Sequence, residues 1–154
     1  MTDALPQPLS TVTTAGLFLP NGDASPSPVV ITVTLWRRLP TCVIVGPSAQ
    51  VARAQAERVR SAIEAVGFEF PRTRIVVDYQ FALPVAVRVS QADFSACDLP
   101  IALAILQASG QIKPVKSGAP FVGSLALDGG CALPGWPAVI TCRTAPSLKI
   151  VTCP

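Results

Sequence analysis

The chain has 154 residues, of which 50% are hydrophobic and only 14% charged, with a formal net charge of +3 and no histidine. This length suits one compact domain with a sizeable core, and the composition excludes a charged, disordered tail. The absence of histidine removes the Ser-His and Cys-His nucleophile pairs and makes a zinc site improbable on chemical grounds. We therefore expect neither a metal nor a cofactor.

The N-terminal residues and the cysteines predict a cytoplasmic protein. No apolar run approaches the roughly 20 residues that span a bilayer, and the first residues lack the basic and apolar regions of a secretory signal. The five cysteines are odd in number, show no C-x-x-C spacing and lie among apolar neighbours. We expect buried free thiols, cytoplasmic localisation and no membrane association.

The first third of the chain is predicted to form strands. β-Branched and other apolar residues dominate three segments that turn formers separate. The expected strands are residues 11–18, 29–36 and 42–45. Residues 1–10, with two prolines, are expected to be a flexible leader, and residues 11–154 a single domain.

An amphipathic helix is predicted to follow these strands. Ser48 is a favourable N-cap, apolar residues recur behind it at helical spacing, and Gly67 is expected to end the helix at C′. A second stripe alternates in charge, with opposite signs three or four residues apart. Its members are Arg53, Glu57, Arg60 and Glu64.

The second half is predicted to alternate strands with a buried helix. Asp98 is expected to cap this helix, whose residues 101–106 are apolar on every side, and Gly110 to end it. A tight turn is expected at residues 128–130 and a short third helix near Pro137. The expected strands are residues 74–79, 85–89, 121–127 and 148–152. The element order predicts an α/β fold, in which two main helices and a short third one pack on a mixed sheet.

Four segments in this order resemble a known family. They read LPTCVIVG at 39–46, ERVRSAI at 57–63, DLPIALAIL at 98–106 and FVGSLALDG at 121–129. Together they are similar to the N-terminal domain of the magnesium chelatase ChlI-subunit-like family that includes the competence protein ComM. The resemblance implies a Lon-protease-like domain, also described as ribosomal protein S5 domain 2-like, which in relatives precedes an AAA+ ATPase module. We expect a standalone copy without that module, because no G-x-x-x-x-G-K-[ST] run occurs in the chain.

The same resemblance implies that the chain is a pseudoenzyme. Active Lon-type domains use a serine-lysine dyad, and their nucleophile position falls here at or near Asp98. Their lysine position falls between residues 134 and 139, where no lysine occurs. We therefore expect no protease or ATPase activity. A Ser-Lys protease that used Ser95 with Lys113 or Lys116 is the less favoured alternative.

Arginines are concentrated in the first half of the chain, and a tryptophan lies beside two of them. Arginine suits phosphate contacts, and an aromatic ring next to positive charge is typical of single-strand binders. With the DNA-processing context of ComM-like relatives, this pattern favours a binding or regulatory module that contacts single-stranded DNA. The candidate residues for nucleic-acid or partner binding are Trp36, Arg37, Arg38, Arg53, Arg58, Arg60 and Trp136. A competing interpretation pairs the helix arginines with Glu57 and Glu64 on a solvated face.

The alternative function is protein–protein interaction or oligomerisation without nucleic acid. Lon-like domains sit in rings above ATPase modules, so a freestanding copy could bind an AAA+ ATPase or associate with itself. Trp136 lies in the loop-like segment Pro134–Pro137 and could anchor such a partner.

Overall fold

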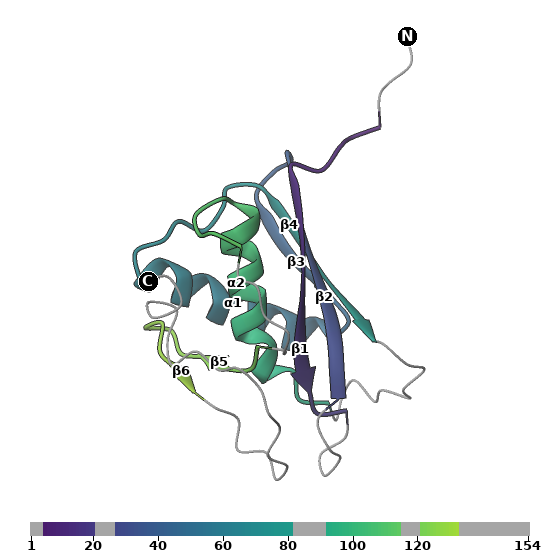
Figure 1. The fold of residues 1–154 in the computed structure, drawn as a ribbon, viewed down its shortest axis with the longest axis vertical. Helices are drawn as coiled ribbons and strands as arrows, with labels where there is room; N and C mark the ends of the chain where they lie inside the picture. Colours follow the sequence, from purple (N-terminus) through teal and green to yellow (C-terminus); the bar gives the residue numbers. More distant parts are fainter. Residues whose placement is uncertain (1–4, 21–26, 82–91, 115–120, 133–154) are drawn as a thin grey trace.

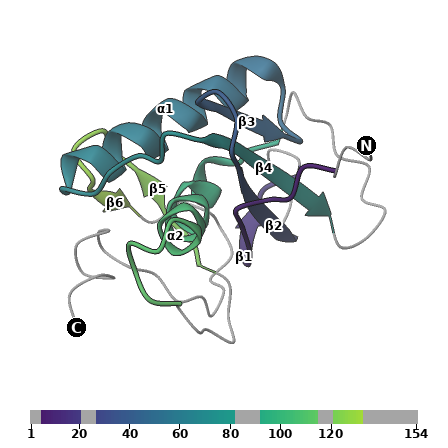
Figure 2. The ribbon, with the colours of Figure 1, turned by 90° about the horizontal axis from the view of Figure 1, so that it is seen from above.

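The computed structural model describes residues 5–20, 27–81, 92–114 and 121–132, which form an α/β arrangement of two layers (Figure 1). Both main helices pack on one face of a four-stranded sheet, and no described helix covers the opposite face (Figure 2). The elements in chain order are β1 (Ser10–Phe18), β2 (Ser27–Trp36), β3 (Thr41–Val45), α1 (Ala49–Ala65), β4 (Arg74–Phe81), the 3₁₀ turn η1 (Ser95–Cys97), α2 (Asp98–Ala108), β5 (Ser124–Leu125) and β6 (Cys131–Ala132).

The sheet is mixed, with the strand order β1-β2-β4-β3. β1 pairs antiparallel with β2 and β2 antiparallel with β4, whereas β3 runs parallel to β4. Parallel neighbours cannot be joined by a tight turn, and α1 forms the crossover between β3 and β4. β3 therefore lies at an edge of the sheet within the described residues.

The core lies between the sheet and α2. In β2 the inward residues Val29, Ile31, Val33 and Leu35 are buried, while alternate residues on the outer face stay partly exposed. The apolar side chains of α2 from Leu99 to Leu106 are fully buried. Burial of each large side chain stabilises the fold by roughly 1.5–3 kcal/mol. The prediction of a mixed sheet with two main helices is confirmed.

The predicted C-terminal ends of α1 and α2, at Gly67 and Gly110, are confirmed, and so is the predicted N-cap of α1 at Ser48. The Ser48 side chain accepts a hydrogen bond from the Val51 N–H at 3.4 Å. Gly67 and Gly110 follow the last helical turns with φ angles of +94° and +76°, which residues with a Cβ rarely adopt. No helix among the described residues is long and apolar enough to cross a membrane.

Two predictions of local structure were wrong. Cys97, not Asp98, is the N-cap of α2, and the Asp98 side chain bonds to other elements. The expected strand over 121–127 is limited to β5, because the Phe121 N–H donates to Ala15 in β1 and the Gly123 N–H donates to Ala96 in η1. The tight turn before β6 is confirmed by the bond from the Gly129 N–H to the Ala126 carbonyl.

Several predictions lie outside the described residues. They are the strands at 85–89 and 148–152, the short helix near Pro137, and the thiols of Cys142 and Cys153. Cys42, Cys97 and Cys131 are free thiols, as predicted, but only Cys97 is fully buried, and Cys42 and Cys131 are partly exposed.

Candidate functional site

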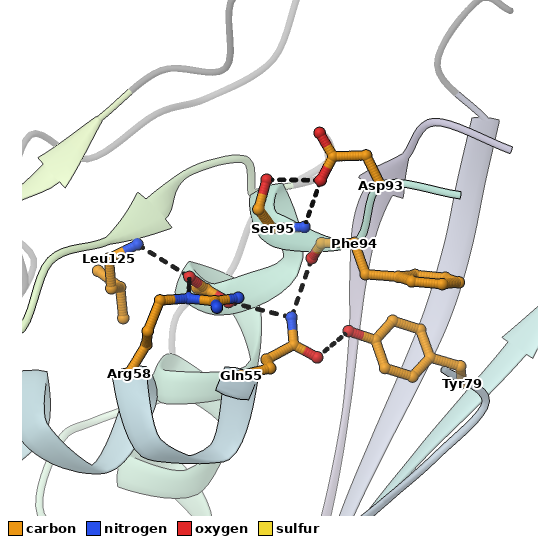
Figure 3. A network of polar contacts seen from close by, with 8 residues as sticks. Gln55, Arg58, Tyr79, Asp93, Phe94, Ser95 and Leu125 are labelled. Carbon is orange, nitrogen blue, oxygen red and sulfur yellow. Dashed lines mark hydrogen bonds and ion pairs between the residues drawn. The ribbon is translucent and has the colours of Figure 1, made fainter. Parts of the chain in front are cut away.

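Asp98 of α2 is the centre of a buried polar network, in which its carboxylate accepts hydrogen bonds from α1 and β5. Figure 3 shows the donors Gln55, Arg58 and Leu125. Its side chain is 0% exposed. Oδ2 accepts hydrogen bonds from Arg58 Nε at 2.9 Å and from the Leu125 N–H at 3.1 Å. Oδ1 accepts from Arg58 Nη2 at 3.1 Å and from Gln55 Nε2 at 3.0 Å. Burial raises the pKa of Asp98, while these donors oppose the rise.

Gln55 extends the network from α1 to the sheet. Its Nε2 also donates to the Phe94 carbonyl at 2.9 Å, and its Oε1 accepts from the Tyr79 hydroxyl at 2.6 Å. The amide of a fully buried glutamine is thus engaged at both ends, which removes the cost of burying it. The network ties α1 to β4, to Phe94 directly before η1, to α2 and to β5.

Ser95, the alternative nucleophile considered from the sequence, is engaged locally. Its N–H and its hydroxyl both donate to Asp93 Oδ1, at 2.9 and 2.7 Å. Lys113 is exposed beyond the end of α2, and Lys116 lies outside the described residues. Within those residues, no group of three or more Cys, Asp or Glu side chains is placed to hold a metal ion.

The three helix arginines of the candidate set have different environments. Arg58 forms the forked pair with Asp98 and keeps only 32% of its side chain exposed, so it supports the core and is not free to contact a ligand. Arg60 pairs with Glu64 at 3.1 Å on the surface, as the competing interpretation expected. Arg53 is exposed and has no ion pair among the described residues.

Trp36, Arg37 and Arg38 gather at one end of the sheet. Trp36 is the last residue of β2, and exposed Arg37 and Arg38 follow it directly. The strand register places Arg74 opposite Trp36 on one side and opposite Thr41 on the other. A hollow of about 670 Å³ lies here, and we call it the Trp36 corner. It is lined by Trp36, Arg38, Leu39, Thr41 and Arg74.

A second, larger hollow lies between β3 and α1, and we call it the β3 groove. It has a volume of about 810 Å³ and is lined by most of β3, one face of α1 and residues 68–73. The charged stripe of α1 faces it. Cys42 also lines it, and burial raises the pKa of this thiol to about 11, while the positive charge of Arg60 opposes the rise.

Comparison with known proteins assigns the chain to a family. The model of subunit ChlI of Mg-chelatase matches residues 31–142, which include both hollows and the Asp98 network. The chain belongs to the ChlI family. The ChlI-family domain is 37% identical over 119 residues to the uncharacterized protein YifB of Salmonella typhimurium and 35% identical over 119 residues to YifB of Escherichia coli. The resemblance predicted from the sequence is confirmed.

These relatives are much longer than the ChlI-family domain. The alignments cover 76% of this chain but 22% of either YifB protein. Both relatives are named as uncharacterized, so their names assign no activity to this domain.

Sequence reasoning missed two residues of these sites. Gln55 interrupts the apolar stripe of α1 between Ala52 and Val59, and a polar residue at such a position signals a buried hydrogen-bonding role. Tyr79 gave no local signal. Arg74 belongs to the arginine cluster noted in the first half of the chain, but its place beside Trp36 depends on the strand register. Trp136, the last candidate, lies outside the described residues.

Proposed function

We propose that this ChlI-family domain is a non-catalytic binding module that holds single-stranded nucleic acid at the Trp36 corner. The observation that carries the proposal is the placement of Arg74 opposite Trp36, next to Arg38. A half-buried indole offers a face on which a base can stack, and guanidinium groups on both sides can contact the flanking phosphates.

The charge at the corner supports the same ligand. Arg37, Arg38 and Arg74 are exposed, and none of them forms an ion pair with another described residue. Unpaired arginines bind phosphate without first breaking an internal pair. Three phosphate contacts to a single strand predict a slope of about −2 in a plot of log affinity against log salt.

The absence of catalysis is part of the proposal, and Asp98 supports it. The resemblance assigns the nucleophile position of Lon-type proteases to or near this residue. A fully buried carboxylate that accepts four hydrogen bonds has no free face for a substrate. Incubation with casein should release no peptides. Cleavage that disappears in a Ser95→Ala or a Lys113→Ala variant would show a protease instead.

The nucleic-acid proposal is tested with a fluorescein-labelled oligothymidine and fluorescence anisotropy. Trp36→Ala should weaken binding roughly 5- to 150-fold, because one stacked base contributes about 1–3 kcal/mol. Trp36→Phe keeps a ring and should retain most of the affinity. Arg38→Gln with Arg74→Gln should reduce the salt slope by about 1.4. Lys113→Gln removes one positive charge from an exposed residue elsewhere and serves as the control for each single substitution.

Two outcomes would refute the nucleic-acid proposal. One is an affinity and salt slope of the Arg38→Gln/Arg74→Gln variant that equal those of the Lys113→Gln control. The other is a Trp36→Ala variant that binds the oligonucleotide as the parent does while circular dichroism shows both to be folded. The first outcome would exclude the two arginines from binding, and the second would exclude the indole.

Protein–protein interaction is the second candidate function, and the exposed edge of β3 favours it. Val43 and Val45 are apolar and 37% and 50% exposed on this edge. An exposed apolar edge strand is a template for pairing with another chain. An AAA+ protein as the partner stays a prediction from the family resemblance.

A further inference from the structure

The free edge of β3 lacks the features that normally prevent edge-to-edge pairing. Among the described residues β3 is hydrogen-bonded to β4 alone. Its sequence, Thr41–Val45, contains no charge and no proline. Natural edge strands are usually protected by lysine, proline or a bulge, because their outward N–H and C=O groups otherwise accept a further strand. This edge is therefore suited to receive one.

The stripe of charges on α1 faces the same opening as this edge. Successive charged residues of the stripe are separated by four, three and four positions. The spacing is therefore the same when the stripe is followed from either end, while the order of positive and negative charges is reversed. Two such helices placed antiparallel bring Arg53 beside Glu64 and Glu57 beside Arg60. The symmetry axis of that arrangement passes between residues 58 and 59. The stripe is thus complementary to itself.

The α1 stripe and β3 line the same groove, with Arg60 of α1 and Cys42 of β3 both among its lining residues. Cys42 is adjacent to Val43, the middle residue of β3. α1 returns from the end of β3 toward its start, as a crossover between parallel strands must. One two-fold axis can therefore relate both the strands and the helices.

We propose that the β3 edge and the α1 stripe form the interface with a second copy of this chain. β3 pairs antiparallel with β3 of the second copy, with Val43 on the two-fold axis, Thr41 opposite Val45 and Cys42 opposite Ile44. The two four-stranded sheets become one continuous sheet, and the two α1 helices lie antiparallel across the groove. The interface is isologous, as closed two-fold dimers require.

A second copy is favoured over an unrelated partner because the α1 stripe is complementary to itself when two copies are related by this symmetry. A groove that binds a peptide of one charge would be lined by residues of the opposite charge, whereas the α1 stripe has equal numbers of positive and negative residues. The internal Arg60–Glu64 pair does not block the exchange, since both side chains are more than half exposed and such pairs are weak. This inference is independent of the Trp36 corner, which shares only Thr41 with the groove.

Charge exchange within the stripe tests the proposal. Analytical ultracentrifugation of the whole chain should show a monomer–dimer equilibrium. In Glu57→Arg, residue 57 meets Arg60 of the second copy at two symmetric places, so the dimer Kd should rise roughly 10- to 100-fold. The double variant Glu57→Arg/Arg60→Glu restores opposite charges at both places and should recover most of the affinity. Higher salt should weaken the parent dimer.

A matched pair of strand variants tests the edge. Val43→Lys places a charge on the proposed axis and should also raise the dimer Kd at least 10-fold. Thr11→Lys makes the same charge change on an exposed residue of β1, at the opposite side of the sheet, and should leave the Kd unchanged. Thermal melts followed by circular dichroism establish that each variant is folded.

Three results would overturn the proposed dimer. A parent chain that stays monomeric at near-millimolar concentration refutes it. So does a dimer that tolerates both Glu57→Arg and Val43→Lys, or a double variant that is no tighter than Glu57→Arg alone. Oligonucleotide binding at the Trp36 corner of these variants separates a failure here from a failure of the proposed function.

Discussion

Replacement of Arg58 by methionine perturbs the Asp98 network at one defined point. The change removes two charge-assisted hydrogen bonds, at 2.9 and 3.1 Å, and leaves a carboxylate that is 0% exposed without its counter-ion. Breaking a buried pair in this way typically costs 3–5 kcal/mol. Because the Arg58 side chain is 32% exposed, water screens part of the interaction, and we expect a loss of about 3 kcal/mol.

The assay is urea unfolding followed by circular dichroism at 222 nm, with Arg60→Met as the control. Both substitutions lie on α1 and change charge and helix propensity equally. Arg60 forms an exposed pair with Glu64 and packs against the Phe70 ring, with 5.6 Å from its guanidinium carbon to the ring centroid. Loss of those contacts should cost less than about 1 kcal/mol.

The pH dependence gives a second readout for the same variant. Burial raises the pKa of Asp98 above its ordinary 3.8, and the hydrogen bonds and charge of Arg58 oppose that rise. In the Arg58→Met variant this opposition is lost, so the pKa of Asp98 is higher still. The folded variant then holds the proton to a higher pH than its unfolded chain does. Its stability is therefore highest below the unfolded pKa and falls as the pH rises toward the folded pKa. The deficit should be larger at pH 8 than at pH 5, and Asp98→Asn in the same chain should reduce both the deficit and the trend.

The reasoning is refuted if Arg58→Met loses no more stability than Arg60→Met. It is also refuted if the deficit of Arg58→Met is the same at pH 5 and pH 8. Either result would mean that Asp98 is solvated or protonated without the help of Arg58.

Two further predictions concern backbone and thiols. Gly129→Ala should cost more than about 2 kcal/mol, since the φ of Gly129 is +91° and an added Cβ would clash with Val66 Cγ1. In Gly110→Ala the added Cβ meets nothing within 4 Å, and the substitution should cost only about 1 kcal/mol in chemical unfolding. Burial raises the pKa of both Cys42 and Cys131 to about 11, so at pH 8 iodoacetamide should modify them far more slowly than it does in urea-unfolded protein, as read by peptide mass spectrometry. Equal rates in folded and unfolded protein would contradict the burial of these thiols.

Features that depend on neighbouring residues could be predicted from the sequence. The cap at Ser48 and the glycine stops at Gly67 and Gly110 follow from the local backbone chemistry of helix ends. The buried character of α2 follows from a segment that is apolar on every side. The family resemblance rested on four local runs of sequence, and the match over residues 31–142 confirms it.

Features that depend on distant partners could not be predicted from the sequence. Asp98 lies where a helix cap is expected, but its partners Arg58 and Leu125 are 40 and 27 residues away. From the sequence, Arg58 could only be grouped with the surface arginines, because no local pattern distinguishes a paired arginine from a free one. In the same way, the strand register alone brings Arg74 beside Trp36.

The Asp98 carboxylate, which connects α1, α2 and β5, also determines how this domain unfolds locally. α1 cannot lift away from α2 without leaving a charge in an apolar interior, and release of β5 removes another of its donors. The amide protons of these three segments should therefore exchange with deuterium together and only through a common, high-energy opening, while those at the exposed edge of β3 exchange by smaller local fluctuations.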